Sequence, residues 1–316
     1  QERGISVTTA VMTFQYEGNT FNLLDTPGHE DFSEDTYRTL TAADSAVMVI
    51  DAAKGIEAQT LKLFEVCRLR DIPIVTFVNK MDREARDPME TLDEIADKLQ
   101  LETTPLMWPV GMGQNFRGVA HLETETFLPF AKQGEHGAAI PLEGNSISQL
   151  LSEEELAKMN EDLDFVRGVC TPFSLESYRE GHQTPVFFGS ALKDFSVEQV
   201  LRAIGAYAPP PKALKADKRM VEPEEDKVSG FVFKVQANMD PNHRDRVAFM
   251  RMVSGHFKRG MKLKPSGSGK VMSVHNPVLF FASDREIVDE AWPGDVMGIP
   301  NHGTLRVGDT LTEGED

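Results

Sequence analysis

The stretch Asp25-Thr26-Pro27-Gly28-His29 closes the apolar run Phe21-Asn22-Leu23-Leu24, which reads as a buried strand. A carboxylate at a strand end followed by a Pro-Gly turn suits a nucleotide site. Asp25 can hold a magnesium ion through water, and the backbone N–H of Gly28 can meet a terminal phosphate. Taken alone, the same stretch fits an ordinary turn equally well, so a second signal is needed.

That second signal is Asn79-Lys80-Met81-Asp82, which follows an apolar strand predicted at residues 72–78. The carboxylate of Asp82 can accept both N–H donors on the guanine edge, whereas adenine offers no such pair. A site built for paired hydrogen bonds strongly rejects an analogue that lacks them. Together, the two strand-end motifs predict a guanine-nucleotide domain.

A third strand-end motif is Ser190-Ala191-Leu192, which follows the predicted strand 185–188. Ligands of open α/β sheets bind at the carboxyl ends of parallel strands, so this triplet is expected beside Asn79. We expect the N–H of Ala191 to bind a base oxygen, Asn79 to fix the loop, and Lys80 to lay its stem along the base. A Ser-Ala-Leu triplet by itself is commonplace and gains meaning only as part of this ordered set.

His29 is the candidate catalytic residue. A histidine directly after a phosphate-facing glycine can orient or polarise an attacking water. Its spacing alone fits an exposed turn histidine better, so the catalytic interpretation needs support from elsewhere in the chain.

Composition bounds the remaining possibilities. The chain has 316 residues, 40% of them apolar and 26% charged, which suits two globular domains. It has no apolar run of membrane-spanning length and no signal-peptide pattern, and its two cysteines fit a reducing compartment such as the cytoplasm. A net charge of −17 argues against a protein that coats nucleic acid with its whole surface, but it leaves room for one local basic face.

Strands and helices alternate from residue 45 to residue 110 and again from 185 to 207, which predicts an α/β domain with a mostly parallel sheet over 1–208. The sheet is expected to include a strand at 106–110. The alternation of strands and helices is interrupted at about 111–184, and we interpret this region as an insertion on the sheet edge. Within it, Ser152 caps a helix, and the last helix of the domain is expected to begin with a Ser196/Gln199 capping box.

The pattern changes after residue 208. Residues 209–226 are rich in proline and charge and read as an extended, fairly stiff linker. Short strands punctuated by glycine turns then run from 227 to 316, and this spacing predicts a small β-barrel.

The start of the chain allows two interpretations. Residues 3–9 fit a disordered end running into a strand better than a mobile loop in which Ser6 supplies a hydroxyl to a metal and a phosphate. The chain contains no Gly-x-x-x-x-Gly-Lys-Ser/Thr phosphate loop. The nearest stretch, 267–270, has Lys264 in place of the first glycine and Val271 in place of the hydroxyl.

Four motifs carry a resemblance to a known family. Arg-Gly-Ile-Ser at 3–6, Asp-Thr-Pro-Gly-His at 25–29, Asn-Lys-Met-Asp at 79–82 and Ser-Ala-Leu at 190–192, with a β-barrel behind them, resemble the translational GTPases. Within that class the chain is similar to the bacterial peptide chain release factor 3 family, essentially from Gln1 to Asp316. The stretches that favour it over elongation factor G are residues 29–38, 235–246 and 301–304.

This resemblance implies a P-loop GTPase-type fold followed by a translation-factor β-barrel. It implies GTP hydrolysis on the ribosome, with GTP/GDP and Mg²⁺ as cofactors, to promote release and recycling of class-one peptide chain release factors. The partners are then the ribosome, through its RNA and proteins, and those factors, with no membrane. Ser6 and Asp25 (through water) would hold the metal, and His29 would be catalytic. The nucleotide-binding residues would be Asp25, Thr26, Pro27, Gly28, His29, Asn79, Lys80, Met81, Asp82, Ser190, Ala191 and Leu192.

In the resembling family, the phosphate loop and first strand lie upstream of the residues that match this chain, and a further domain lies downstream. We therefore expect a fragment that by itself binds nucleotide weakly and hydrolyses little or none. The rival interpretations are another ribosomal GTPase, such as elongation factor G or a ribosomal protection protein, and a non-hydrolysing ribosome-binding module.

Residues 251–270 hold six cationic side chains and no acid, on an otherwise acidic chain. They are candidate contacts to ribosomal RNA, although a solvated barrel edge with charges that block edge pairing is about as plausible. The six are Arg251, Lys258, Arg259, Lys262, Lys264 and Lys270.

Overall fold

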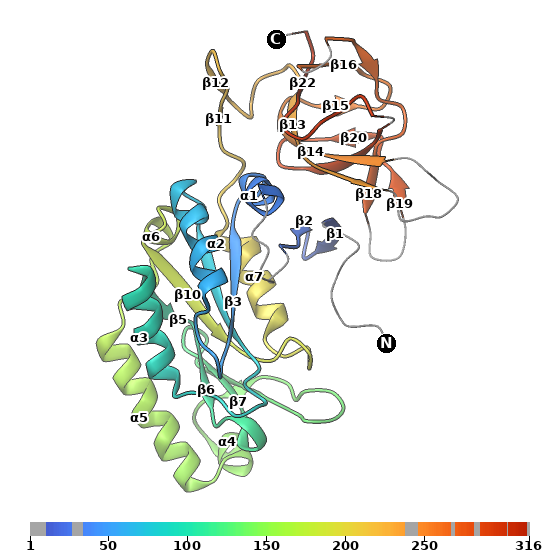
Figure 1. The fold of residues 1–316 in the computed structure, drawn as a ribbon. Helices are drawn as coiled ribbons and strands as arrows, with labels where there is room; N and C mark the ends of the chain where they lie inside the picture. The colour runs from blue at the N-terminus through green and yellow to red at the C-terminus, as the bar shows by residue number, and fades with distance from the viewer. Residues whose placement is uncertain are drawn as a thin grey trace. The chain divides into compact units, whose positions relative to one another are not determined.

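The computed structural model describes residues 11–26, 34–237, 246–266, 269–280, 285–301 and 303–314 (Figure 1). Contacts divide the chain into two compact units. One is Ser45–Ala208, and the other joins the described residues up to Asp44 with those from Pro209 onward. The described residues before Ser45 therefore do not group with the rest of the stretch 1–208.

The unit Ser45–Ala208 is built on a parallel sheet with strand order β3-β4-β10-β5. All six residues of β10 and the first five of β4 are buried, as in a sheet covered on both faces. Helices α2 and α3 cover one face and α7 the other (Figure 1), which confirms the α/β prediction. The elements are β3 (Ala46–Asp51), α2 (Ala58–Leu69), β4 (Ile74–Asn79), α3 (Pro88–Leu99), β5 (Glu102–Pro105), β10 (Gln183–Phe188) and α7 (Val197–Tyr207).

A second, antiparallel sheet with order β6-β7-β8-β9 interrupts this pattern. The strand expected at 106–110 is not part of the parallel sheet, because β5 takes that place and the chain turns at Leu106. From Met107 onward the backbone pairs with β7 instead, so the insertion begins earlier than predicted. Its elements are β6 (Met107–Val110), a 3₁₀ turn (Gly113–Asn115), β7 (Gly118–His121), β8 (Thr126–Pro129), β9 (Ile140–Pro141), α4 (Asn145–Leu150), α5 (Glu153–Val169) and α6 (Leu175–Arg179).

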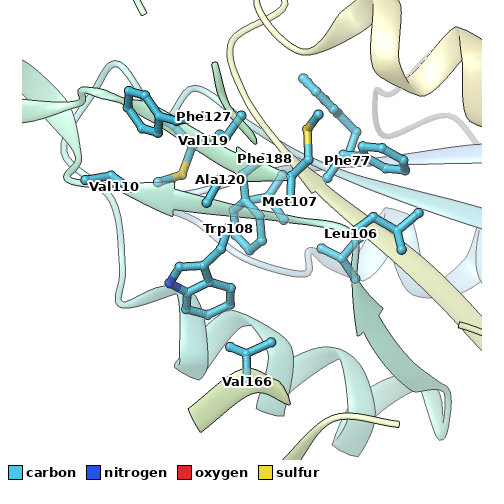
Figure 2. Packing of buried hydrophobic residues seen from close by; sticks show 14 of the residues in the cluster. Phe77, Leu106, Met107, Trp108, Val110, Val119, Ala120, Phe127, Val166 and Phe188 are labelled. Atoms are coloured by element: carbon cyan, nitrogen blue, oxygen red, sulfur yellow. The ribbon is translucent and has the colours of Figure 1, made fainter. Parts of the chain in front are cut away.

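The insertion and the parallel sheet share one apolar core (Figure 2). Trp108 of β6 is 1% exposed and meets Phe188 of β10 edge-on, with ring centroids 5.5 Å apart. Its indole N–H donates to the Asp162 carboxylate on α5 at 3.2 Å, so the one polar atom of this large side chain is satisfied. The packing therefore fixes the insertion against the strand whose end carries Ser190.

Side-chain caps begin three of the six helices described in this unit, namely α3, α5 and α6. The Asp87 side chain accepts from the N–H of Met89 ahead of α3, and Ser152 and Glu155 form a reciprocal capping box on α5. The capping box predicted at Ser196 is wrong. Ser196 has φ +70°, makes no side-chain cap bond, and its hydroxyl is buried with no partner in the described part of the chain.

The second unit contains an eight-stranded antiparallel sheet, ordered β17-β16-β22-β13-β14-β21-β18-β19, that curls into a half-barrel. Buried side chains from several of its strands, among them Val232, Met250 and Leu263, form its core. Its strands are β13 (Ser229–Ala237), β14 (Arg246–Ser254), β16 (Lys262–Pro265), β17 (Met272–Ser273), β18 (Val278–Phe280), β19 (Arg285–Ile287), β21 (Val296–Asn301) and β22 (Thr310–Thr312), with β15 (Phe257–Lys258) paired to β20 (Glu290–Ala291).

Strands β1 (Val11–Tyr16) and β2 (Asn19–Leu24) form an antiparallel hairpin, and among the described strands they pair only with each other. Helix α1 (Glu34–Thr41) follows the hairpin. Val11 and Ala42 are buried in a cluster with Phe233, Phe249 and neighbouring residues of the half-barrel. This shared apolar cluster is why the described residues before Ser45 group with the C-terminal unit.

The predicted linker is not uniformly extended. Residues Leu214–Lys215 (β11) and Met220–Val221 (β12) pair as a small hairpin. Arg219 and Glu225 form a two-pronged ion pair at 2.6 and 2.9 Å, and the same carboxylate accepts from the N–H of Glu222. Arginine–carboxylate pairs of this geometry fix direction as well as distance.

Ser152, which caps α5, and Ser196, which precedes α7 without capping it, give a matched test. Ser152→Ala should lower the free energy of unfolding of its unit by about 1 kcal/mol, because it removes an N-cap. Ser196→Ala should leave that free energy unchanged or slightly raised, because it removes a buried hydroxyl that has no partner. Urea unfolding followed by Trp108 fluorescence, in a Trp292→Phe background, measures both. Equal losses would contradict the difference in capping between Ser152 and Ser196.

Candidate functional site

Three strand ends meet at one edge of the parallel sheet. Asp51, the last residue of β3, is in register with Asn79, the last residue of β4. The N–H of Gly189, just past β10, donates to the carbonyl of Val78, and the N–H of Met81 donates back to the carbonyl of Gly189, both at 3.0 Å. The motif 79–82 and the triplet 190–192 are therefore brought together, at the carboxyl ends where ligands of such sheets bind.

The Asn79 side chain joins the two loops. Its amide oxygen accepts from the N–H of Lys80 at 2.8 Å and from the N–H of Ala191 at 2.9 Å. The expected fixing contact is present, but it uses the N–H that was assigned to a base oxygen. The Ala191 donor is thus already engaged, while the next N–H along, that of Leu192, has no hydrogen-bond partner among the described residues.

Lys80 holds an unusual backbone conformation, with φ +69°, that turns the chain away from β4. Its ammonium lies 3.1 Å from Oδ2 of Asp51, and its side chain is 45% exposed. Partial burial acts to raise the pKa of Asp51, but hydrogen bonds from Ala53, Lys80 and Lys54 outweigh it and hold that pKa below its ordinary value. Asp51 was not identified as a site residue from the sequence. The signal that could have found it is its place at the end of a predicted buried strand.

Met81 and Asp82 face different surroundings. Met81 is 1% exposed and belongs to the core, so its side chain anchors the loop. Asp82 is half-buried, and its carboxylate has no hydrogen-bond or ion-pair partner within the described part of the chain. A carboxylate held at a strand edge and not used by the fold is open to paired donors from a ligand.

The loop that carries the Ser-Ala-Leu triplet is a closed turn. Ser190 is 1% exposed, and it exchanges two backbone hydrogen bonds with Phe195 at 3.2 and 2.9 Å. The N–H of Asp194 donates to the carbonyl of Ala191 at 3.0 Å. Leu192 stands out from this turn with 81% of its surface exposed.

The phosphate-side residues are placed only in part. Asp25 and Thr26 directly follow β2. Ser6, Pro27, Gly28 and His29 lie outside the described residues, as do residues 30–33 and 238–245. Among the described residues, no group of three or more His, Cys, Asp or Glu side chains is placed to hold a metal.

The six candidate RNA-contact cations separate into different environments. Arg251 is 8% exposed and is bound to the Asp44 carboxylate at 2.7 Å and to the carbonyl of Ala42, so it is not available on the surface. The sequence of 251–270 did not reveal this structural role, because Arg251 there is one cation among six. Lys258, Lys262 and Lys270 are exposed, and Lys264 is half-buried.

The stretch 251–270 has no acid of its own, but the fold supplies acids to it. Arg259 lies 3.7 Å from the Asp289 carboxylate and donates to the carbonyl of His275 at 2.7 Å. Lys258 lies opposite Glu290 in the backbone register of β15 and β20. The expected basic face is therefore partly neutralised by neighbours that are distant in sequence.

No helix in the described part of the chain is both long and apolar enough to cross a membrane.

Comparison with known proteins places this geometry in a family. Residues 1–210 match the family model of the elongation factor Tu GTP binding domain, and residues 227–314 match that of elongation factor G domain 2. The crystal structure of ttk003000868 from Thermus thermophilus is similar, with a TM-score of 0.76 and 23% sequence identity. The match covers 99% of this chain and 47% of that one, so this chain spans about half its length. At that identity the likeness shows the fold alone.

The Asn79 contact can be tested without any ligand. Asn79→Ala should speed amide hydrogen exchange at Ala191 about fivefold, because the loop loses one hydrogen bond. Asn79→Asp keeps an oxygen acceptor at the same position and should preserve most of the protection. Exchange measured by NMR reports each amide separately. Unchanged exchange at Ala191 in Asn79→Ala would show that the amide does not hold the loop.

Proposed function

We propose that this chain, which belongs to the elongation factor Tu GTP-binding domain family, recognises guanine at the shared end of β4 and β10. The observation that carries the proposal is the loop pair itself: the Asn79 amide oxygen joins Lys80 to Ala191, and in the same loop the Asp82 carboxylate has no partner among the described residues. A preformed loop pair with one unused acceptor group suits a planar ligand that brings two donors.

Each residue of this corner then has a defined role. Asp82 accepts from the two N–H groups of the guanine edge. Lys80 lays its aliphatic stem along the base, and Met81 anchors the loop in the core. The turn 190–192 walls the opposite side, with the N–H of Leu192 as the donor available to the base oxygen, since that of Ala191 is bound to Asn79.

The phosphate side is proposed from the order of motifs. Asp25 would hold Mg²⁺ through water and Ser6 through its hydroxyl, since Mg²⁺ prefers a few oxygen ligands and keeps several waters. Asp25 follows the end of a strand, as such a role requires. Thr26, Pro27 and Gly28 would form the turn that meets the terminal phosphate.

His29 is proposed as the residue that orients the attacking water. The water oxygen forms a bond to the γ-phosphorus while the bond to the bridging oxygen breaks, which yields GDP and inorganic phosphate. Loss of that phosphate would release the contacts at Ser6 and Gly28 and allow the segments around them to relax.

For the whole protein we propose a ribosomal GTPase of translation termination that releases and recycles class-one peptide chain release factors. The residues that support this finer assignment are 29–38, 235–246 and 301–304. A second candidate is an elongation factor G-like or ribosomal protection activity, which the match of residues 227–314 to elongation factor G domain 2 favours.

One experiment separates these candidates. A protein that carries these residues together with a phosphate loop is added, with GTP, to ribosomes held at a stop codon by a class-one release factor. Accelerated factor release that requires GTP hydrolysis supports the termination role. GTP hydrolysis without factor release would point to the second candidate. The absence of both GTP hydrolysis and factor release would point to a non-hydrolysing ribosome-binding module.

The base-edge assignment predicts a change of nucleotide preference. Asp82→Asn should weaken GDP binding and favour XDP, because the 2-oxo group of xanthine needs a donor where guanine supplies one. A matched control is Asp93→Asn on the exposed face of α3. Competition against fluorescent GDP measures both variants. An unchanged preference for GDP over XDP in Asp82→Asn would remove Asp82 from the base edge.

The catalytic assignment predicts a loss of turnover with little loss of affinity. In a protein that includes a phosphate loop, His29→Ala should leave nucleotide affinity near that of the parent and lower ribosome-stimulated GTP hydrolysis about a hundredfold or more. Single-turnover phosphate release separates the chemical step from binding. Equal turnover in the two proteins would contradict the role of His29.

A further inference from the structure

We infer that Asp51 is a positioning residue for guanine-nucleotide binding, and that it acts by holding the ammonium group of Lys80. The inference rests on the proposed function and adds a residue that lies outside all the nucleotide motifs. Asp51 ends β3, whereas those motifs follow β2, β4 and β10.

The contact itself joins two strand ends. Oδ2 of Asp51 lies 3.1 Å from Nζ of Lys80, and the backbones of Asp51 and Asn79 are directly in register across β3 and β4. The Asp51 side chain is 17% exposed and the Lys80 side chain is 45% exposed. The Lys80 side chain is therefore held at its far end while its stem keeps an open surface.

The carboxylate is itself fixed before it meets the lysine. Oδ1 of Asp51 accepts from the N–H of Ala53 at 2.8 Å and of Lys54 at 3.2 Å, and its backbone carbonyl accepts from Gly55 at 2.8 Å. One oxygen thus closes the turn after β3, and the other is left aimed at the ammonium. This division of the two oxygens allows the turn and the ion pair to be separated by mutation.

The turn is clamped from the segment that follows Asp82. Arg86 donates from its backbone to the carbonyl of Ala52 at 3.0 Å and from its guanidinium to that of Lys54 at 2.8 Å. It also binds Glu94 of α3 at 2.7 Å, and Glu94 accepts from the N–H of Ile56 at 2.6 Å.

Gly55 makes this close approach feasible. It has φ +72°, and a Cβ built on it would lie 2.6 Å from the Arg86 guanidinium and 2.7 Å from the Glu94 carboxylate. The turn that presents Asp51 and the segment that follows Asp82 are therefore one braced structure.

This brace has a physical consequence for binding. A lysine side chain has four flexible torsions, and ordering them when a ligand arrives costs affinity. An ammonium already bound to a fixed carboxylate has less freedom to lose, so the stem is set in place before the base arrives. An ion pair with no such role would stabilise the fold slightly and leave nucleotide affinity unaltered.

The test is a double-mutant cycle in the 316-residue chain. Asp51→Asn keeps an oxygen for Ala53 and Lys54 but removes the negative charge. Lys80→Met keeps the stem but removes the ammonium. Dissociation constants for GDP with Mg²⁺ come from NMR titration of the Asn79 and Ala191 amides, with ATP as the control ligand, because titration also resolves weak binding.

We expect Asp51→Asn to raise the GDP dissociation constant about three- to fivefold, in proportion to the modest strength of a partly exposed ion pair. In the Lys80→Met background the same change should have no effect. Asp51→Asn should also shift the Lys80 side-chain NMR signals, a signature that loss of stability alone does not produce. The thermal midpoint should stay close to that of the parent.

Two sets of results would overturn the inference, and they differ. A parent chain that binds GDP no better than ATP would overturn the proposed function together with this role for Asp51. A parent chain that prefers GDP, with an Asp51→Asn dissociation constant unchanged or raised equally in both backgrounds, would overturn the role of Asp51 alone.

Discussion

The Asn79 side-chain amide oxygen joins the two loops of the candidate site, because it accepts from the N–H of Lys80 in one loop and from that of Ala191 in the other. β4 and β10 pair over residues 76–78 and 186–188, and backbone hydrogen bonds from Gly189 to Val78 and from Met81 to Gly189 extend this pairing just past the strand ends. Asn79 continues the cross-strand connection one step further, to Ala191. A buried or half-buried amide that satisfies two backbone donors at once is costly to replace, since losing it leaves both unpaired.

The rest of the Ser45–Ala208 unit supports that connection. β10 is buried along its whole length, and its last residue packs on Trp108 of the antiparallel insertion. The hydrogen bond between Trp108 and Asp162 fixes the ring, so helix α5 and the insertion hold the strand that leads to Ser190. On the other side, Arg86 and Glu94 brace the turn after β3. The insertion and the brace therefore give the strand-end loops a rigid base, which suits binding of a planar ligand.

Charge is organised differently in the two units. In the half-barrel, Arg251 serves the fold through Asp44 and the carbonyl of Ala42, while Arg259 and Lys258 face acids from β20 and the residue before it. Exposed lysines such as Lys262 and Lys270 remain for contact with an anionic partner. At the strand ends of the other unit, by contrast, the lysine is paired and the acid Asp82 has no partner among the described residues, which fits recognition of the donor groups of a base.

Local sequence determined the features that depend on near neighbours. The alternation of buried strands and helices predicted the parallel sheet, and a short motif predicted the capping of α5 by Ser152, because a cap bonds residues only two or three positions away. The same reasoning brought 79–82 and 190–192 to one edge, since parallel strands end together.

Only the tertiary structure decided features that depend on distant partners. Met107 pairs with β7 instead of extending the parallel sheet, and Val11 is buried against the half-barrel. The Ser196 hydroxyl does not cap the helix that follows it. Asp51 reaches Lys80 because two strands lie in register, and Arg251 is taken into the fold by Asp44. Such choices follow from competition among contacts far apart in sequence, which no local pattern encodes.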